Sequence, residues 1–161
     1  MKPLAILLML VVLASLLGTA YLYTSCNVQV QQVQLLAQEA SSQERTFSSL
    51  RQQIEHTSVQ GILFDNTPLG EIEDYQFLTY QVTLSNTCYI PADMIEMQIT
   101  PQNGDVLQIG DSTNHTLRAR AQDTCSVTLL TSRESDPVRE IQITYYLWGI
   151  PFYLRANYAT R

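Results

Sequence analysis

The chain has 161 residues, a formal net charge of −6 and a hydrophobic fraction of 45%. Its only lysine is Lys2, and the other basic residues are eight arginines spread along the chain against fifteen acidic residues. This acidic balance repels phosphate backbones, so it argues against nucleic acid as a partner.

A stretch without charged side chains, LAILLMLVVLASLLGTAYLY, covers residues 4–23 directly behind Lys2. A helix of this length spans about 30 Å, which is the hydrocarbon thickness of a bilayer. No basic residue follows the stretch until Arg45. The positive-inside rule therefore predicts a single-pass protein of the cell membrane, with a cytoplasmic N-terminus and an extracytoplasmic C-terminal domain. The lipid bilayer is its first predicted partner, through residues 4–23.

Three fates of this segment are compatible with the sequence. Residues 1–25 form an uncleaved signal anchor, or a signal peptide is cleaved after the small residues Gly18 and Ala20, or Cys26 carries a lipid. We favour the anchor, because an apolar run of 20 residues is longer than the core of an ordinary signal peptide. Tyr23, three residues before Cys26, is too bulky for a typical lipoprotein signal.

Residues 26–58 are predicted to form a stalk with one amphipathic helix at about 42–56. The glutamine-rich part, 27–38, fits either strand alternation or a helix. Ser41 and Glu44 have the spacing of a capping box, and Phe47, Leu50 and Ile54 lie on one helical stripe. A three-four spacing through residues 33–54 is also compatible with a dimeric coiled coil, but packing of the stripe against the following domain is the favoured interpretation.

Residues 59–161 change to short segments rich in β-branched and aromatic residues, separated by Gly, Pro, Asn and Asp. The predicted strands are 61–64, 76–85, 93–100, 105–109, 116–121, 126–131, 140–148 and 152–158. Asn103 and Gly104 predict a hairpin turn, and residues 148–151 join the last two strands. Alternation gives each strand one buried face. The predicted fold is therefore mainly β, a single antiparallel β-sandwich, with a small barrel as the alternative.

The segments YQVTLSNT, IPADMIEMQITP and TYYLWGIPFYLRANY lie between residues 75 and 158. This pattern resembles the immunoglobulin-like domains that uncharacterised bacterial envelope proteins carry behind an N-terminal membrane anchor. The resemblance implies the fold but no activity. It lacks the Cys, Trp, Cys order of antibody domains, because Trp148 follows both Cys88 and Cys125.

Cys88 and Cys125 share their alternation parity with apolar neighbours, so both are predicted to face the core. An oxidising compartment permits a disulfide between them, and two buried thiols are the alternative. Cys26 is then a free thiol, or it forms a disulfide between two chains.

No constellation for catalysis or metal binding is recognisable. His56 and His115 stand outside any nucleophile motif, and the cysteines lack the close pairs of a zinc site. The acidic residues in the loop 65–74 are better read as a solvated loop than as a calcium site. We therefore predict no enzyme activity, no cofactor and no metal.

The C-terminal segment concentrates aromatic residues. Tyr146 and Trp148 have the parity opposite to Tyr145, and together with Tyr153 they are the candidate binding residues. Cover by the helical stripe is the favoured alternative. The predicted function is a membrane-anchored extracytoplasmic binding or scaffold protein that docks a protein partner; the alternative is a ligand-binding accessory or sensor domain.

Overall fold

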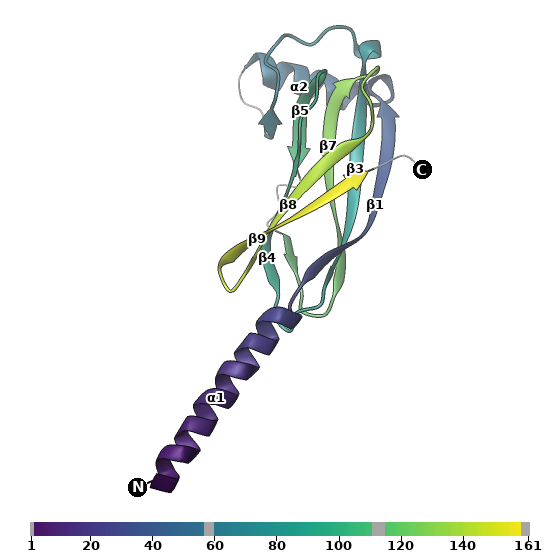
Figure 1. The fold of residues 1–161 in the computed structure, drawn as a ribbon. Helices are drawn as coiled ribbons and strands as arrows, with labels where there is room; N and C mark the ends of the chain where they lie inside the picture. The colour runs from purple at the N-terminus through teal and green to yellow at the C-terminus, as the bar shows by residue number, and fades with distance from the viewer. Residues whose placement is uncertain (1, 57–59, 111–114, 159–161) are drawn as a thin grey trace.

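The computed structural model describes residues 2–56, 60–110 and 115–158, and it consists of an N-terminal helix and a β-sandwich (Figure 1). Helix α1, Lys2–Ser25, projects from one end of the sandwich. Its segment Leu4–Tyr21 has a mean hydropathy of 2.4, and none of it is buried against the rest of the protein. By length and composition, this helix is able to span a membrane.

The other elements follow in a single domain. They are β1 Val28–Glu39, the 3-10 helix η1 Ala40–Gln43, α2 Glu44–Glu55, β2 Ile62–Leu63, the 3-10 helix η2 Ile72–Asp74, β3 Tyr75–Asn86, β4 Ala92–Ile99, β5 Asp105–Gly110, β6 His115–Leu117, β7 Gln122–Ser132, β8 Arg139–Leu147 and β9 Ile150–Tyr158. The eight predicted strands are confirmed as β2 to β9, although β6 has only three residues.

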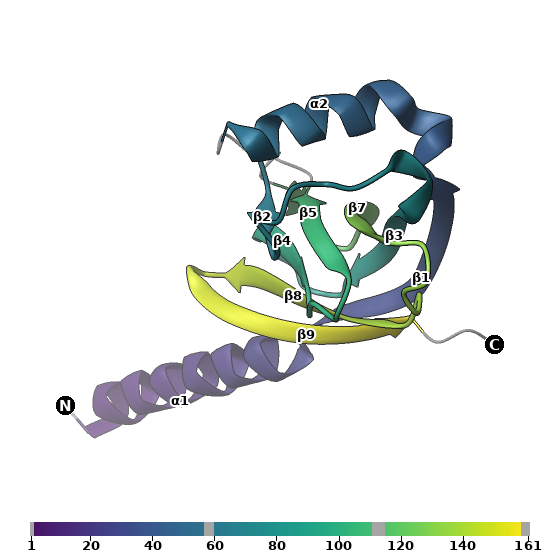
Figure 2. The ribbon, with the colours of Figure 1, turned by 90° about the horizontal axis from the view of Figure 1, so that it is seen from above.

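The strands form two antiparallel sheets that pack face to face (Figures 1 and 2). The first sheet has the order β1-β3-β7-β5-β2 and the second has the order β6-β4-β8-β9. If the seven longer strands are lettered A to G in chain order, these orders contain ABED and CFG. This is the arrangement of a constant-type immunoglobulin domain, with β2 and β6 added at the edges. The predicted mainly β sandwich is confirmed.

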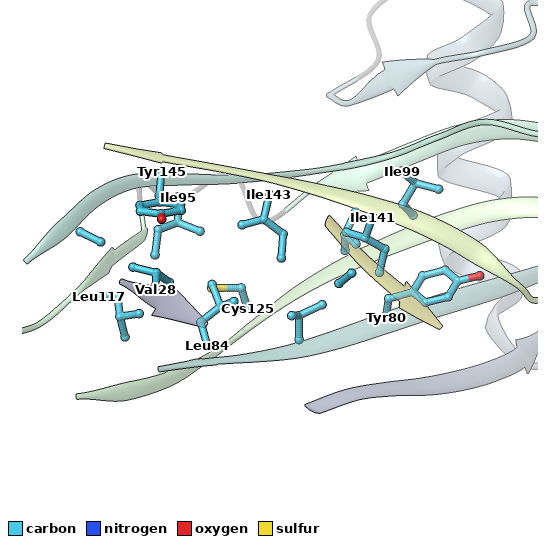
Figure 3. Packing of buried hydrophobic residues seen from close by; sticks show 14 of the residues in the cluster. Val28, Tyr80, Leu84, Ile95, Ile99, Leu117, Cys125, Ile141, Ile143 and Tyr145 are labelled. Carbon is cyan, nitrogen blue, oxygen red and sulfur yellow. The ribbon is translucent and has the colours of Figure 1, made fainter. Parts of the chain in front are cut away.

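The core lies between the two sheets (Figure 3). Ile141, Ile143 and Tyr145 of β8 face Tyr80 and Leu84 of β3, and all five are at most 3% exposed. These residues occupy alternate positions of their strands, in agreement with the predicted alternation. On one side β1 approaches β9, which closes the sandwich there (Figure 2).

The predicted stalk is wrong for residues 28–39, because β1 is an integral strand of the first sheet. It pairs with β3 from Val28 opposite Asn86 to Glu39 opposite Gln76. A β-bulge between Val30 and Gln32 moves the inward parity from even to odd positions, so that Val33 faces inward after it. This change of parity explains why the sequence of β1 fits no single alternation.

Helix α2 begins two residues later than predicted, and the capping box does not form. The Ser42 hydroxyl donates to the Glu39 carbonyl at 2.7 Å within η1, and Gln43 precedes the helix without a side-chain cap. The apolar stripe of α2 is buried as expected.

The surface on which this stripe packs differs from the prediction. Phe47, Leu50 and Ile54 pack on the outer face of the first sheet and not on the C-terminal hairpin (Figure 2). Their neighbours in this second cluster include Phe77, Val106, Leu107 and Leu130. Strands β3 and β7 are therefore buried on both faces at this end, since consecutive residues such as Leu129 and Leu130 point to opposite sides.

Gly104 has a positive φ of 91°, but its turn does not form the predicted hairpin. Strand β4 belongs to the second sheet and β5 to the first, so the turn carries the chain across the sandwich. Buried Gln108 of β5 links the sheets here, since its amide donates to the Met97 carbonyl at 2.8 Å and accepts from the Ile99 amide at 2.7 Å.

Candidate functional site

The disulfide joins Cys26 to Cys88, with 4.4 Å between the Cα atoms, which corrects the predicted pairing of Cys88 with Cys125. The cause is the register of β1 and β3. Val28 lies opposite Asn86, and the same register continued by two residues places Cys26 opposite Cys88. Cys125 lies farther along, opposite Val82 and buried in the core. Recognition of residues 28–39 as a strand was the signal needed to find this bridge.

Asn86 shapes the loop that carries Cys88. Its side-chain oxygen accepts from the Cys88 amide at 2.8 Å, and its amide donates to the carbonyls of Ile90, Leu117 and Arg118 at 2.8 to 3.2 Å. The side chain is only 2% exposed. A buried amide that satisfies four backbone groups holds its surroundings in one geometry.

The three predicted binding residues fall into two places. Tyr146 and Tyr153 are diagonal neighbours on the outer face of the second sheet, because Tyr146 pairs with Pro151 and Tyr153 pairs with Thr144. Trp148 lies in the two-residue turn between β8 and β9, with φ 53°, followed by Gly149 with φ 76°. Tyr153 is 63% exposed and Trp148 is 53% exposed, whereas Tyr146 is half-buried. The binding role of these residues stays a prediction.

Trp148 also lines a hollow of about 120 Å³ together with Tyr89 and the disulfide. This volume is well below the roughly 300 Å³ at which small-molecule sites begin. The hollow therefore does not favour a ligand pocket at the aromatic residues.

The larger concave feature is a side groove of about 960 Å³, which sequence reasoning missed. It runs from α2 across the β2–β5 edge of the first sheet to β4 of the second. Its floor is buried and mainly apolar, and its rim is polar and exposed. The floor comprises Leu50, Ile95, Gln108, Cys125 and Val127, and the rim includes Arg45, Thr46, Ser49, Gln60 and Glu96.

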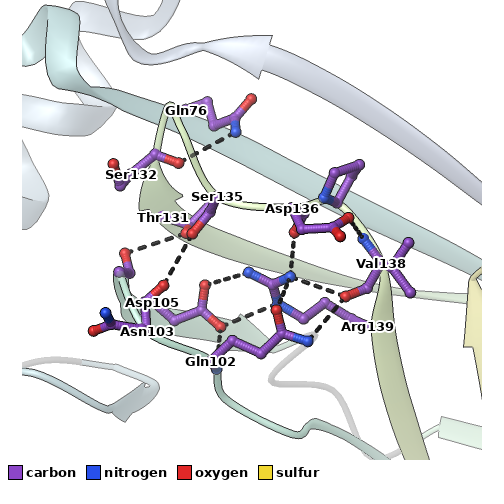
Figure 4. Close-up of polar contacts among 12 residues, drawn as sticks. Gln76, Gln102, Asn103, Asp105, Thr131, Ser132, Ser135, Asp136, Val138 and Arg139 are labelled. Carbon is purple, nitrogen blue, oxygen red and sulfur yellow. Dashed lines mark hydrogen bonds and ion pairs between the residues drawn. The ribbon is translucent and has the colours of Figure 1, made fainter.

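A buried ion pair stabilises the end of the sandwich far from α1 (Figure 4). The Arg139 guanidinium donates to both carboxylate oxygens of Asp105, at 2.7 and 3.1 Å, and also to Gln102 and to the carbonyls of Asp136 and Val138. Every acceptor belongs to the fold, so the network is structural and offers no group to a ligand.

The histidines and acidic residues do not assemble into a reactive group. Within residues 2–56, 60–110 and 115–158, no cluster of three His, Cys, Asp or Glu side chains has the geometry to hold a metal. His56 is exposed at the end of α2. His115 begins β6 opposite Ile95 and lines the side groove half-buried.

Comparisons with known proteins add little to this description. No protein-family model matches the chain, and no curated protein matches it. Among solved structures, the GAE domain of yeast GGA1 is similar with a TM-score of 0.40 and 12% sequence identity, over 58% of this chain and 96% of that chain. This likeness is too low to support an inference about function.

Proposed function

We propose that this protein is a membrane-anchored extracytoplasmic binding domain, without catalytic activity, that docks a segment of a protein partner in the side groove. The groove carries the proposal. An apolar floor inside a polar rim is the anatomy of protein–protein interfaces. The three predicted aromatic residues lie outside the groove, so the proposal does not depend on them.

Two observations support the anchoring and the orientation. Helix α1 is long and apolar enough to span a bilayer, with Lys2 before it and no basic residue after it until Arg45. The Cys26–Cys88 disulfide begins immediately beyond α1, and disulfides persist in oxidising compartments outside the cytosol. The same bond occupies the sulfur that a lipid on Cys26 requires, which disfavours the lipoprotein alternative. The resemblance to bacterial envelope proteins implies the same extracytoplasmic location, which is part of this proposal.

Site-specific photocrosslinking in native membranes tests the docking site. A photoreactive side chain replaces Ser49 on the groove rim, and the control position is Gln34, an exposed residue of β1 at the opposite edge of the first sheet. We expect one protein adduct from position 49 and none from position 34. Equal adducts from both positions, or none from position 49, contradict the proposal.

A small ligand in the same groove is the second candidate, because 960 Å³ lies within the range of ligand sites. Native mass spectrometry of the protein released from its membrane distinguishes the two candidates. A bound small molecule that disappears when Ser49→Trp fills the groove supports a ligand-binding accessory, whereas a mass of the chain alone supports protein docking.

A further inference from the structure

The end of the sandwich nearest α1 gathers segments that are distant in sequence. Helix α1 ends at Ser25, and the disulfide at Cys26 holds the loop that follows β3 beside this point. The β8–β9 turn lies at the same end (Figure 1). Ser25, Tyr89 and Trp148 line one small hollow, so the last residue of α1 and the tip of the hairpin border the same space.

Several exposed side chains at this end are of types that favour a membrane–water interface, next to the exposed carboxylates Asp93 and Asp123. Tyr89 is 69% exposed, Trp148 is 53% exposed, and Ile150 is 50% exposed. The guanidinium of Arg120 lies 4.1 Å from the centre of the Tyr89 ring. Tyr and Trp are enriched at the level of the lipid headgroups, where the ring is in an apolar layer and the polar atom reaches water. Arginine reaches the same layer with its charged end in water.

The backbone at this end is unusual as well. Met94, Arg120 and Trp148 are the non-glycine residues with positive φ among the described residues, and all three lie near it. A two-residue hairpin turn of this kind favours asparagine where Trp148 stands. The protein thus presents a large aromatic ring at the tip despite an unfavourable backbone conformation.

We propose that this membrane-proximal face, formed by Tyr89, Arg120, Trp148 and Ile150, lies in the headgroup layer of the bilayer that α1 spans. The inference rests on the membrane anchoring proposed above. A helix that spans the hydrocarbon layer places its C-terminal turn at the outer interface. Residues that border the same hollow as Ser25 are therefore at interfacial depth. This face contacts phospholipid. The contact holds the domain at one fixed orientation to the membrane.

Trp148 is the only tryptophan of the chain, so its fluorescence reports on this face alone. The full chain is reconstituted into phosphatidylcholine vesicles with bromine atoms near the headgroup end of the acyl chains. We expect the bromolipids to quench Trp148 several-fold more strongly than aqueous iodide does. The matched control is the double variant Trp148→Phe, Tyr153→Trp, which moves the reporter to the outer face of β9, where iodide is expected to be the stronger quencher.

Three results overturn the inference. The first is that iodide quenches Trp148 as strongly as it quenches the control reporter. The second is that both reporters respond equally to bromolipid. The third is that Trp148 is shielded in native membranes but not in pure lipid, because a protein and not phospholipid would then cover the face. Flotation of the vesicles separates this test from the anchoring itself. Protein that does not float with lipid contradicts membrane anchoring by α1. Protein that floats but has a water-exposed Trp148 contradicts only the position of the membrane-proximal face in the headgroup layer.

Discussion

Arg139 is a charged residue that is only 1% exposed, and its carboxylate partner Asp105 is 4% exposed. At the scale of single residues, we expect Arg139→Ala to lower the free energy of unfolding by about 3 to 5 kcal/mol, because Asp105 is left buried without its counterion. Urea denaturation measures this loss. The control is Arg155→Ala, which breaks an exposed pair with Glu140 and is expected to cost at most about 1 kcal/mol. Similar losses in both variants contradict the prediction.

Because of Tyr80, we expect the free energy of unfolding to fall at alkaline pH. Burial raises the pKa of its phenol above the ordinary value, and the hydroxyl donates to the Pro137 carbonyl at 2.7 Å. The folded state therefore keeps a proton that the unfolded state loses above about pH 10. Stability is fully present below that pH and falls as pH rises, by up to about 1.4 kcal/mol per pH unit for each such tyrosine.

Burial also raises the pKa of Tyr145, so two tyrosines contribute to this dependence. Urea denaturation between pH 9 and about pH 11 measures it. We expect a smaller pH slope in Tyr80→Phe and in Tyr145→Phe than in the unmodified protein. An unchanged slope in Tyr80→Phe would refute the assignment.

The sequence alone predicted which single residues face inward but not which residues meet. Tyr80, Leu84, Ile141 and Ile143 follow simple alternation, and their burial could be read directly. Arg139 and Asp105 are 34 positions apart on strands of different sheets, and nothing in the spacing indicates their contact. Such pairs depend on tertiary topology.

At the scale of elements, Gly61 determines how closely β2 approaches β5. A Cβ added at Gly61 would lie 2.3 Å from the backbone oxygen of Gln108, and its φ is 155°. We expect Gly61→Ala to lower the free energy of unfolding by about 1 to 3 kcal/mol, because backbone must move. Thermal unfolding measures this as a fall of several degrees in Tm. Gly110→Ala is the control, since a Cβ there meets nothing within 4 Å. Equal effects at both glycines would show that the close approach does not matter.

Eight strands were predictable because each is a short β-branched or aromatic segment between turn residues, whereas β1 and the position of α2 were not. The bulge after Val30 interrupts the alternation of β1. The outer position of α2 depends on Phe77 of β3 and Leu130 of β7, single apolar residues that point away from the main core in strands that otherwise alternate. The candidate site suffers from the same limit, because the side groove is assembled from α2 and five strands and has no local signature.

At the scale of the whole molecule, the disulfide closes a separation of 62 residues between the end of α1 and the loop after β3. The chain-entropy model gives about 4 kcal/mol for a loop of this size. We expect Cys26→Ser and Cys88→Ser each to lose about this amount and the double variant to lose no more than either. Chemical denaturation of the full chain in lipid nanodiscs measures the losses.

Cys125→Ala is the matched control, with an expected loss of about 1 kcal/mol for one buried heavy atom. The pairing of Cys88 with Cys125 predicts the reverse pattern, in which Cys26→Ser is harmless and Cys125→Ala is costly. That outcome would restore the pairing that alternation alone had suggested.

The position of the disulfide also decides how the domain responds to mechanical load. If α1 anchors the chain and a partner binds the side groove, as proposed above, a pull between them enters the domain at Cys26, immediately before β1. Without the bond, the pull would reach the domain through β1 alone, whose first pair with β3 is Val28 and Asn86. With the bond, the force also passes through the two sulfurs to Cys88, so the end of β3 shares the load. Reduction of one covalent bond would therefore leave the whole load on a single edge strand.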